Sequence, residues 1–425
     1  LFMDVFIVTV ASIILVYYTT KNKKMNIMPL QLALILNIGV LTMPGIVMIS
    51  FFTPDTLVNQ HNISEETKNI VLVLYLISFF LIVVATKFAI NIENKLHVDT
   101  EVIPWHIALS FLVSIVGLLI IVVLQRGLEN IPLYSLINGD PLQAAINKKL
   151  YMTKMLPTSS EVLNQLLRFG ALFLYFYQLL RYFSNKTSKG ILVSSFIVVC
   201  IVFTLDGHKG PLLFIIIGSL YIIFLKDRSK FLIKYIFYGF LLFISFIFWY
   251  AYALNINQYD ISFLFEKFVE RAFFLQSAGM YIIIETFDPD INLIKHGMIG
   301  ASYLFDDLPP RAFSVIMEEL YGYSDTNVNM NSYFISEAYS WGGLYGALAS
   351  SIIIFFHIII SNKIIAKFSR NNYDMYVSLS LVYYLFYFPL VQGFNSFLYF
   401  RNLAFFTFCC LFVLFMLKKI KFSAK

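Results

Sequence analysis

Long apolar runs dominate this sequence and restrict the surroundings in which it can fold. Of its 425 residues, 59% are hydrophobic and only 13% are charged, and the mean hydropathy is +0.77. A soluble chain of this length carries about a quarter charged residues, which cover the wet surfaces of its domains. Because this chain has too few charged residues to cover such surfaces, the sequence predicts an all-α, polytopic integral membrane protein.

Several runs are long enough to cross a hydrocarbon layer of about 30 Å as helices. We predict about eleven transmembrane helices, near residues 2–19, 27–52, 69–90, 103–124, 162–183, 191–205, 211–225, 232–254, 333–360, 375–395 and 400–417. They form one membrane domain over residues 1–425. No internal repeat is evident, so the sequence gives no support to a transporter built from repeats.

The basic residues indicate how the chain is oriented. Most of the 31 Lys and Arg residues fall in one set of alternate loops, together with the C-terminus. Cytoplasmic loops retain Lys and Arg, so we expect the C-terminus in the cytoplasm and the N-terminus outside. Two large loops then lie outside, at residues 126–160 and 255–332, and loops of this length are usually functional. In the second, residues 261–274 and the stretch from Pro309 to Gly322 predict short helices, the first of them amphipathic.

Composition also excludes several kinds of function. The net charge of +6 is spread between hydrophobic runs and is not gathered with stacking aromatics, so no nucleic-acid partner is expected. The three cysteines, Cys200, Cys409 and Cys410, lie in apolar stretches and indicate neither a disulfide framework nor a zinc site. Asp288 and Asp290 have the spacing of some metal-binding carboxylates, but with Pro289 between them they favour a turn. We expect no metal and no other cofactor.

A few ionisable residues stand at membrane depth or in the two outer loops, and such residues are functional candidates by default. They are Arg168 within a span, Glu337 and Arg401 at the starts of spans, Asp206, His208 and Lys209 in a turn, and Arg126, Arg271 and Arg311 in the loops. Arg suits bidentate binding of phosphate, and Lys suits pairing as a point charge. The set therefore favours an anionic ligand such as a lipid-linked pyrophosphate.

Structural roles are open for the same residues. Arg126 and Arg401 at helix ends could extend to the lipid headgroups, and Glu337 is favourable at a helix start in any case. Arg168 could form an internal ion pair, and residues 206–209 could be a hydrated turn.

The layout of spans and loops carries a family resemblance. Asp206 to Pro211 forms a turn that opens an apolar helix, and Asn331, Ser332 and Tyr333 lead through Glu337 to Gly342, Gly343 and Gly346. With the two outer loops, this pattern resembles the oligosaccharide repeat-unit polymerases, the O-antigen polymerases called Wzy. Lys209 departs from the pattern, because family members more often have Arg there.

The resemblance implies a metal-independent, inverting glycosyltransferase of the C-like type in the bacterial inner membrane. It would transfer a growing glycan from undecaprenyl pyrophosphate onto a lipid-linked repeat unit, with a chain-length regulator and a flippase as partners. The resemblance implies pyrophosphate or acidic-sugar binding by Arg126, Arg168, Lys209, Arg271, Arg311 and Arg401, and catalysis by Glu337, His208 and Asp206.

Three other functions remain open. An O-antigen ligase uses the same donor but places the polymer on the lipid A core. A flippase or transporter of lipid-linked sugar would need charges along a path near the bilayer midplane, whereas the ionisable residues here collect at one face. A scaffold without activity would tolerate alanine at Arg401 and Lys209.

Overall fold

In the part of the chain that the computed structural model describes, all regular secondary structure is helical. The described residues are 2–21, 28–51, 63–93, 105–140, 143–144, 146–147, 158–184, 186–205, 210–226, 275–298, 304–305, 308–321, 333–369, 372–391 and 393–423. They fall into two compact units. Unit 1 comprises residues 1–96, 260–366 and 387–404, and unit 2 comprises residues 97–259, 367–386 and 405–425.

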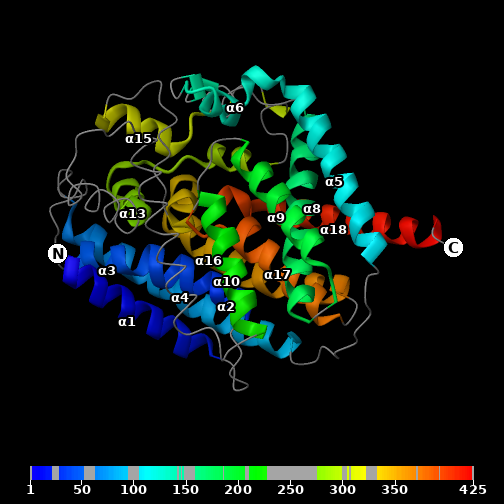
Figure 1. The fold of residues 1–425 in the computed structure, drawn as a ribbon. Helices are drawn as coiled ribbons and strands as arrows, with labels where there is room; N and C mark the ends of the chain where they lie inside the picture. Colours follow the sequence, from blue (N-terminus) through cyan, green and yellow to red (C-terminus); the bar gives the residue numbers. More distant parts are fainter. Residues whose placement is uncertain are drawn as a thin grey trace. The chain divides into compact units, whose positions relative to one another are not determined.

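Unit 1 begins with apolar helices that lie side by side (Figure 1). They are α1 (Phe2–Thr20), a continuous rod of α2 (Pro29–Leu34), η1 (Ile35–Thr42) and α3 (Met43–Phe51), and α4 (Glu65–Glu93). The middle of the rod is a π-helix, in which the Met43 N–H donates to Ile38 O. Pro44 follows at once, and because proline has no N–H and crowds the preceding turn, a wider turn is favoured there.

Helix α13 (Leu275–Thr286) packs on this rod through paired polar groups. Ser277 Oγ donates to Thr42 O at 3.0 Å, and Tyr281 Oη donates to Ile46 O at 3.1 Å. Polar groups buried in an apolar protein need such partners, because an unmade hydrogen bond is costly there. These bonds fix α13 along the rod and so fix the start of the segment that leads to the candidate site.

The rest of unit 1 is built from short elements around the start of a long helix. These elements are η5 (Ile291–Gly297), α15 (Ala312–Tyr321), α16 (Phe334–Ser369), η7 (Phe394–Ser396), η8 (Leu398–Phe400) and the first residues of α18 (Arg401–Ser423). Helix α16 is broken at Gly343, whose φ of 58° and ψ of −144° lie outside the helical region. Its first segment is tied down at both ends, since Phe334 N donates to Leu390 O at 2.9 Å and Asp290 N donates to Ser340 O at 2.8 Å.

Unit 2 is arranged around one buried helix. Helix α8 (Thr158–Phe183) contacts α5 (Trp105–Arg126), α9 (Lys189–Thr204), α10 (Gly210–Lys226) and α17 (Tyr373–Val382). Phe176 of α8 lies against Gly218 of α10, where a Cβ would come within 2.7 Å of the ring. The unit also holds η3 (Leu128–Asn130), α6 (Pro132–Ile137) and η6 (Tyr383–Tyr387).

Five described helices are long and apolar enough to cross a membrane, which supports an all-α membrane protein. They are Pro29–Phe51, Glu65–Ile90, His106–Arg126, Phe334–Ser369 and Leu398–Phe415, and shorter apolar helices cover Asp4–Thr20, Lys189–Thr204 and Pro211–Lys226. The number of eleven spans stays a prediction. The predicted span at 232–254 and the predicted amphipathic helix at 261–274 lie outside the described residues.

Two predicted elements can be compared directly with the structure. The short helix expected after Pro309 and Pro310 is confirmed as α15, Ala312–Tyr321. The span expected at 375–395 is wrong at its end, because the helical residues stop at Tyr387. Pro389 disfavours helical backbone in the residue before it, and Gly393 has a φ of +103°.

Candidate functional site

The side chain of Glu337, in the first segment of α16, is held by one residue of η7. Asn395 N donates to Glu337 Oε2 at 2.8 Å, and Asn395 Nδ2 donates to Glu337 Oε1. Both carboxylate oxygens are therefore engaged, which fixes the plane of the carboxylate. The backbone passes very close at Gly393, where a Cβ would collide with Glu337 Oε2. With its φ of +103°, this position needs glycine for two separate reasons.

Two guanidinium groups lie within electrostatic reach of the same carboxylate. They belong to Arg311, which precedes α15, and to Arg401, the first residue of α18. Arg311 is exposed and Arg401 is partly buried. Two positive charges beside one negative charge leave a net positive charge, so this cluster can attract a further anion.

Arg401 follows a strained turn. Tyr399 and Phe400 have φ values of 54° and 55°, in the left-handed region that bulky residues rarely adopt. Packing holds the turn, because the Phe400 ring stacks on His357 with centroids 5.5 Å apart and planes 3° apart. His357 is fully buried and also contacts Phe397, with ring centroids 5.1 Å apart. A packing role for His357 agrees with its place within a long apolar helix.

His296 lies in η5, within electrostatic reach of Arg311. Its Nε2 is 2.7 Å from Pro309 O, which the neutral ring can reach as a donor. Burial lowers the pKa of His296, the hydrogen bond to Pro309 opposes this, and the charge of Arg311 lowers the pKa further. The imidazole is therefore neutral near pH 7. The sequence gives no reason to single out this residue, because one histidine in a long loop carries no signal by itself.

These side chains surround a very small cavity. It measures about 10 Å³ and is lined by Glu337, Asn395, Trp341, Ser340, His296 and Arg311, among others. This is about the space that a single water molecule needs. Within the described part of the chain, Trp341 Nε1 and Asn395 Oδ1 are buried and have no hydrogen-bond partner. Such atoms are rare in native proteins, and here one is a donor and the other an acceptor, both on residues that line this cavity.

The structure brings together three of the predicted site residues. Glu337, Arg311 and Arg401 form the cluster in unit 1. Arg126 and Arg168 belong to unit 2, where Arg126 ends α5 and the Arg168 guanidinium carbon lies 5.8 Å from the centre of the Phe203 ring. The remaining predicted residues, Asp206, His208, Lys209 and Arg271, lie outside the described residues.

Part of the predicted outer loop at residues 126–160 is folded within unit 2. After Arg126, Gly127 adopts a φ of 75° and ends α5. Asn147 Nδ2 then joins the loop to itself, donating to Glu129 O at 2.7 Å and to Ser135 Oγ at 3.0 Å. This part of the predicted loop is therefore folded around a buried amide.

One of the two aspartates flanking Pro289 has a structural role. Asp290 Oδ1 accepts from Asn292 N at 2.9 Å and so caps η5. The turn centred on Pro289 stays a prediction. Among the described residues, no group of three or more His, Cys, Asp and Glu side chains is placed to hold a metal ion.

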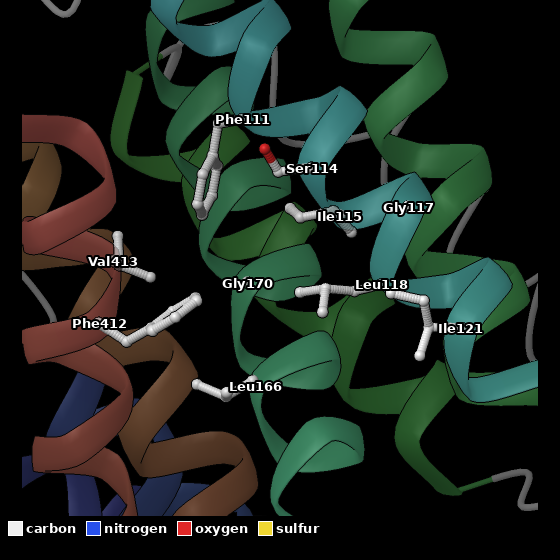
Figure 2. A pocket seen from close by; sticks show the side chains of 10 residues that line it. All are labelled: Phe111, Ser114, Ile115, Gly117, Leu118, Ile121, Leu166, Gly170, Phe412 and Val413. Carbon is white, nitrogen blue, oxygen red and sulfur yellow. The ribbon is translucent and has the colours of Figure 1, made fainter. Parts of the chain in front are cut away.

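A larger cavity in unit 2 is apolar. It measures about 250 Å³, and Figure 2 shows side chains of α5, α8 and α18 turned toward it, including Phe111, Leu166 and Phe412. Its one hydroxyl, that of Ser114, donates to Ser110 O at 2.9 Å. Because its lining offers no acid, base or cation, the chemistry of the chain is better sought at the cluster around Glu337.

Fold and site together describe an α-helical membrane protein with a cationic cluster built around one carboxylate. No known protein family, no curated protein and no solved structure matches this chain.

Proposed function

We propose that this protein polymerises lipid-linked oligosaccharide repeat units at the outer face of the bacterial inner membrane. The observation that carries the proposal is the Glu337 carboxylate, fixed by Asn395 and flanked by Arg311 and Arg401 at the start of a broken apolar helix. Broken helices at membrane depth are tolerated where they line a cavity or are buried in protein. The family resemblance of the sequence supports the same function.

The proposed reaction is a group transfer between two lipid-linked sugars. A hydroxyl oxygen of the acceptor forms a bond to the anomeric carbon of the donor glycan. The bond from that carbon to the pyrophosphate oxygen breaks, and its electron pair leaves with undecaprenyl pyrophosphate. Arg311 and Arg401 stabilise the departing anion, and Glu337 accepts the proton of the hydroxyl. Attack opposite the leaving group inverts the anomeric carbon.

The other predicted site residues are assigned to substrate binding or to proton transfer. Arg126, Arg168, Lys209 and Arg271 are proposed to bind pyrophosphate or acidic sugars, and His208 and Asp206 are the alternative bases. Both lipid-linked substrates would have their tails in the bilayer and their headgroups at the outer loops.

A deletion strain tests the proposal. Electrophoresis of surface polysaccharide from this strain is expected to show the ladder of chain lengths reduced to core bearing a single repeat unit. Loss of every repeat unit would instead indicate a flippase or a ligase. An unchanged ladder would remove polymerisation from consideration.

Complementation of that strain tests the site. Glu337→Gln preserves the size of the side chain but removes its negative charge, and we expect polymer to fall by about 100-fold or more, as for loss of a catalytic base. The matched control is Asp374→Asn, which removes the carboxylate that Lys226 contacts at 3.1 Å in unit 2. This control is expected to restore the ladder at equal protein level. A normal ladder with Glu337→Gln would exclude Glu337 as the base.

A further inference from the structure

Two residues that line the cavity beside Glu337 each carry a buried polar atom that lacks a hydrogen-bond partner among the described residues. The two atoms are the indole donor Trp341 Nε1 and the amide acceptor Asn395 Oδ1, and each residue is only 7% exposed. A buried indole N–H normally finds an acceptor, and a buried amide oxygen normally finds a donor. The pair therefore indicates a group that can satisfy both atoms.

Both side chains are held in place by their surroundings. Trp341 lies four residues after Glu337 on α16, a spacing that places both on one helix face. Its ring packs on Phe394, with centroids 5.5 Å apart and planes 31° apart. Asn395 is fixed through its Nδ2, which donates to Glu337, so its Oδ1 is left for another donor. The donor and the acceptor are thus set in advance of any ligand.

The size and polarity of the cavity restrict what fits. A volume of about 10 Å³ admits one small group and excludes a sugar ring or a phosphate. A phosphate oxygen can only accept, so it would leave Asn395 Oδ1 unpaired and would be repelled by Glu337. A hydroxyl both donates and accepts, which matches Asn395 Oδ1 and Trp341 Nε1.

We propose that this cavity binds one hydroxyl group of the acceptor sugar, with Trp341 donating to the hydroxyl oxygen and Asn395 accepting its hydrogen. The inference rests on the proposed function and adds to it a contact that selects and positions the acceptor next to Glu337. Sites that hydrogen-bond a substrate hydroxyl discriminate strongly against analogues that lack it, because the buried partners are then left unpaired.

The test uses the full chain in lipid nanodiscs. The donor is the lipid-linked repeat unit extracted from the deletion strain, and the acceptor is the oligosaccharide released from that lipid by mild acid. Trp341→Phe removes the N–H and keeps an aromatic ring. The matched control is Tyr345→Phe, which removes a polar atom from a ring that is 88% exposed on the same helix. For Trp341→Phe we expect the KM for the acceptor to rise about five- to tenfold with the KM for the donor unchanged, and for Tyr345→Phe we expect no change.

A second measurement uses the wild-type protein, so that it does not depend on how the variant folds. Acceptors that each lack one hydroxyl are compared, and removal of one particular hydroxyl is expected to raise the acceptor KM in wild type. The same removal should add little in Trp341→Phe, because the partner is already absent.

The possible failures can be told apart. If the wild-type protein extends no acceptor, the proposed function fails. If it extends the acceptor and Trp341→Phe has wild-type KM values, the inference fails alone and the cavity is a site for structural water. A wild-type response that is equal for every missing hydroxyl would also overturn it.

Discussion

The position of the Glu337 carboxylate depends on a single glycine. Gly393 has a φ of +103°, and a Cβ there would collide with Glu337 Oε2. We predict that Gly393→Ala displaces the carboxylate and lowers polymer by about tenfold or more, because misplacing a reacting group by about 1 Å can cost 10²-fold in rate. Polymer and protein level are measured together in the complemented deletion strain.

The control separates collision from backbone strain. Gly139 also has a positive φ, of 77°, but nothing lies within 4 Å of the position that its Cβ would occupy. Gly139→Ala should therefore cost only the strain of left-handed backbone, about 1 kcal/mol or slightly more, and leave the ladder unchanged. Equal loss of polymer in both variants would mean that the contact with Glu337 is not what matters.

The surroundings of His296 predict that the stability of the folded protein depends on pH. Burial and the charge of Arg311 lower its pKa below the ordinary value, against the hydrogen bond to Pro309. The unfolded chain then binds this proton more readily than the folded protein. Its contribution to stability is present above the ordinary pKa of about 6.5 and is lost as pH falls through the lowered value. We predict that the thermal unfolding temperature in detergent falls as pH drops below about 6.5.

A variant without the imidazole tests the cause. Glutamine at this position keeps an N–H that can reach Pro309 O and has no proton to gain. We expect the unfolding temperature of His296→Gln to depend less on pH than that of wild type in the same range. An identical pH profile would assign the effect to other groups.

Residue type alone identified only the charged part of the site. Glu337, Arg311 and Arg401 stand out in the sequence because a charge at membrane depth or in a large outer loop is unusual. Trp341 and Asn395 do not stand out, since neutral residues in an apolar protein carry no such signal. Their importance depends on contacts between segments more than fifty residues apart, which the spacing of residues in the sequence cannot supply.

At the level of elements, the break in α16 ends the short helical segment that carries Glu337 and Trp341. Gly343 has a φ of 58° and a ψ of −144°, a conformation open almost only to glycine. We predict that Gly343→Ala destabilises the protein by about 1–3 kcal/mol and lowers polymer, because the first segment of α16 must shift to relieve the strain. Thermal unfolding of the purified protein and the polysaccharide ladder measure the two effects.

The neighbouring glycine is the matched control. Gly342 has open space around its Cβ position and no positive φ. Gly342→Ala should be neutral, or stabilising by up to about 1 kcal/mol through helix propensity. If both substitutions behaved alike, the break in α16 would have no special part in the site.

Hydropathy predicts which segments form helices, but it does not predict where the backbone conformation of single residues interrupts them. Apolar length predicted α1, the rod of α2 to α3, α4, α5, α8, α9 and α10 to within about four residues at each end, because a membrane segment must satisfy its own backbone. The same rule predicted helix through residue 395, but Pro389 and Gly393 interrupt it. The strained pair Tyr399 and Phe400 lies between this predicted span and α18. Hydropathy is averaged over many residues and therefore does not detect these interruptions. The candidate site lies where they occur.

For the whole molecule, orientation in the membrane decides whether the site can meet its proposed substrate. Lipid-linked repeat units would be presented at the outer face, so residues 291–321 should lie there and the C-terminus in the cytoplasm. We predict that alkaline phosphatase inserted between η5 and α15 is active, and that green fluorescent protein at the C-terminus fluoresces. Alkaline phosphatase fused after Lys226 should be inactive, because that end of α10 is expected to face the cytoplasm. The opposite pattern would place Glu337 and its two arginines on the cytoplasmic side, and polymerisation at the outer face would then be impossible.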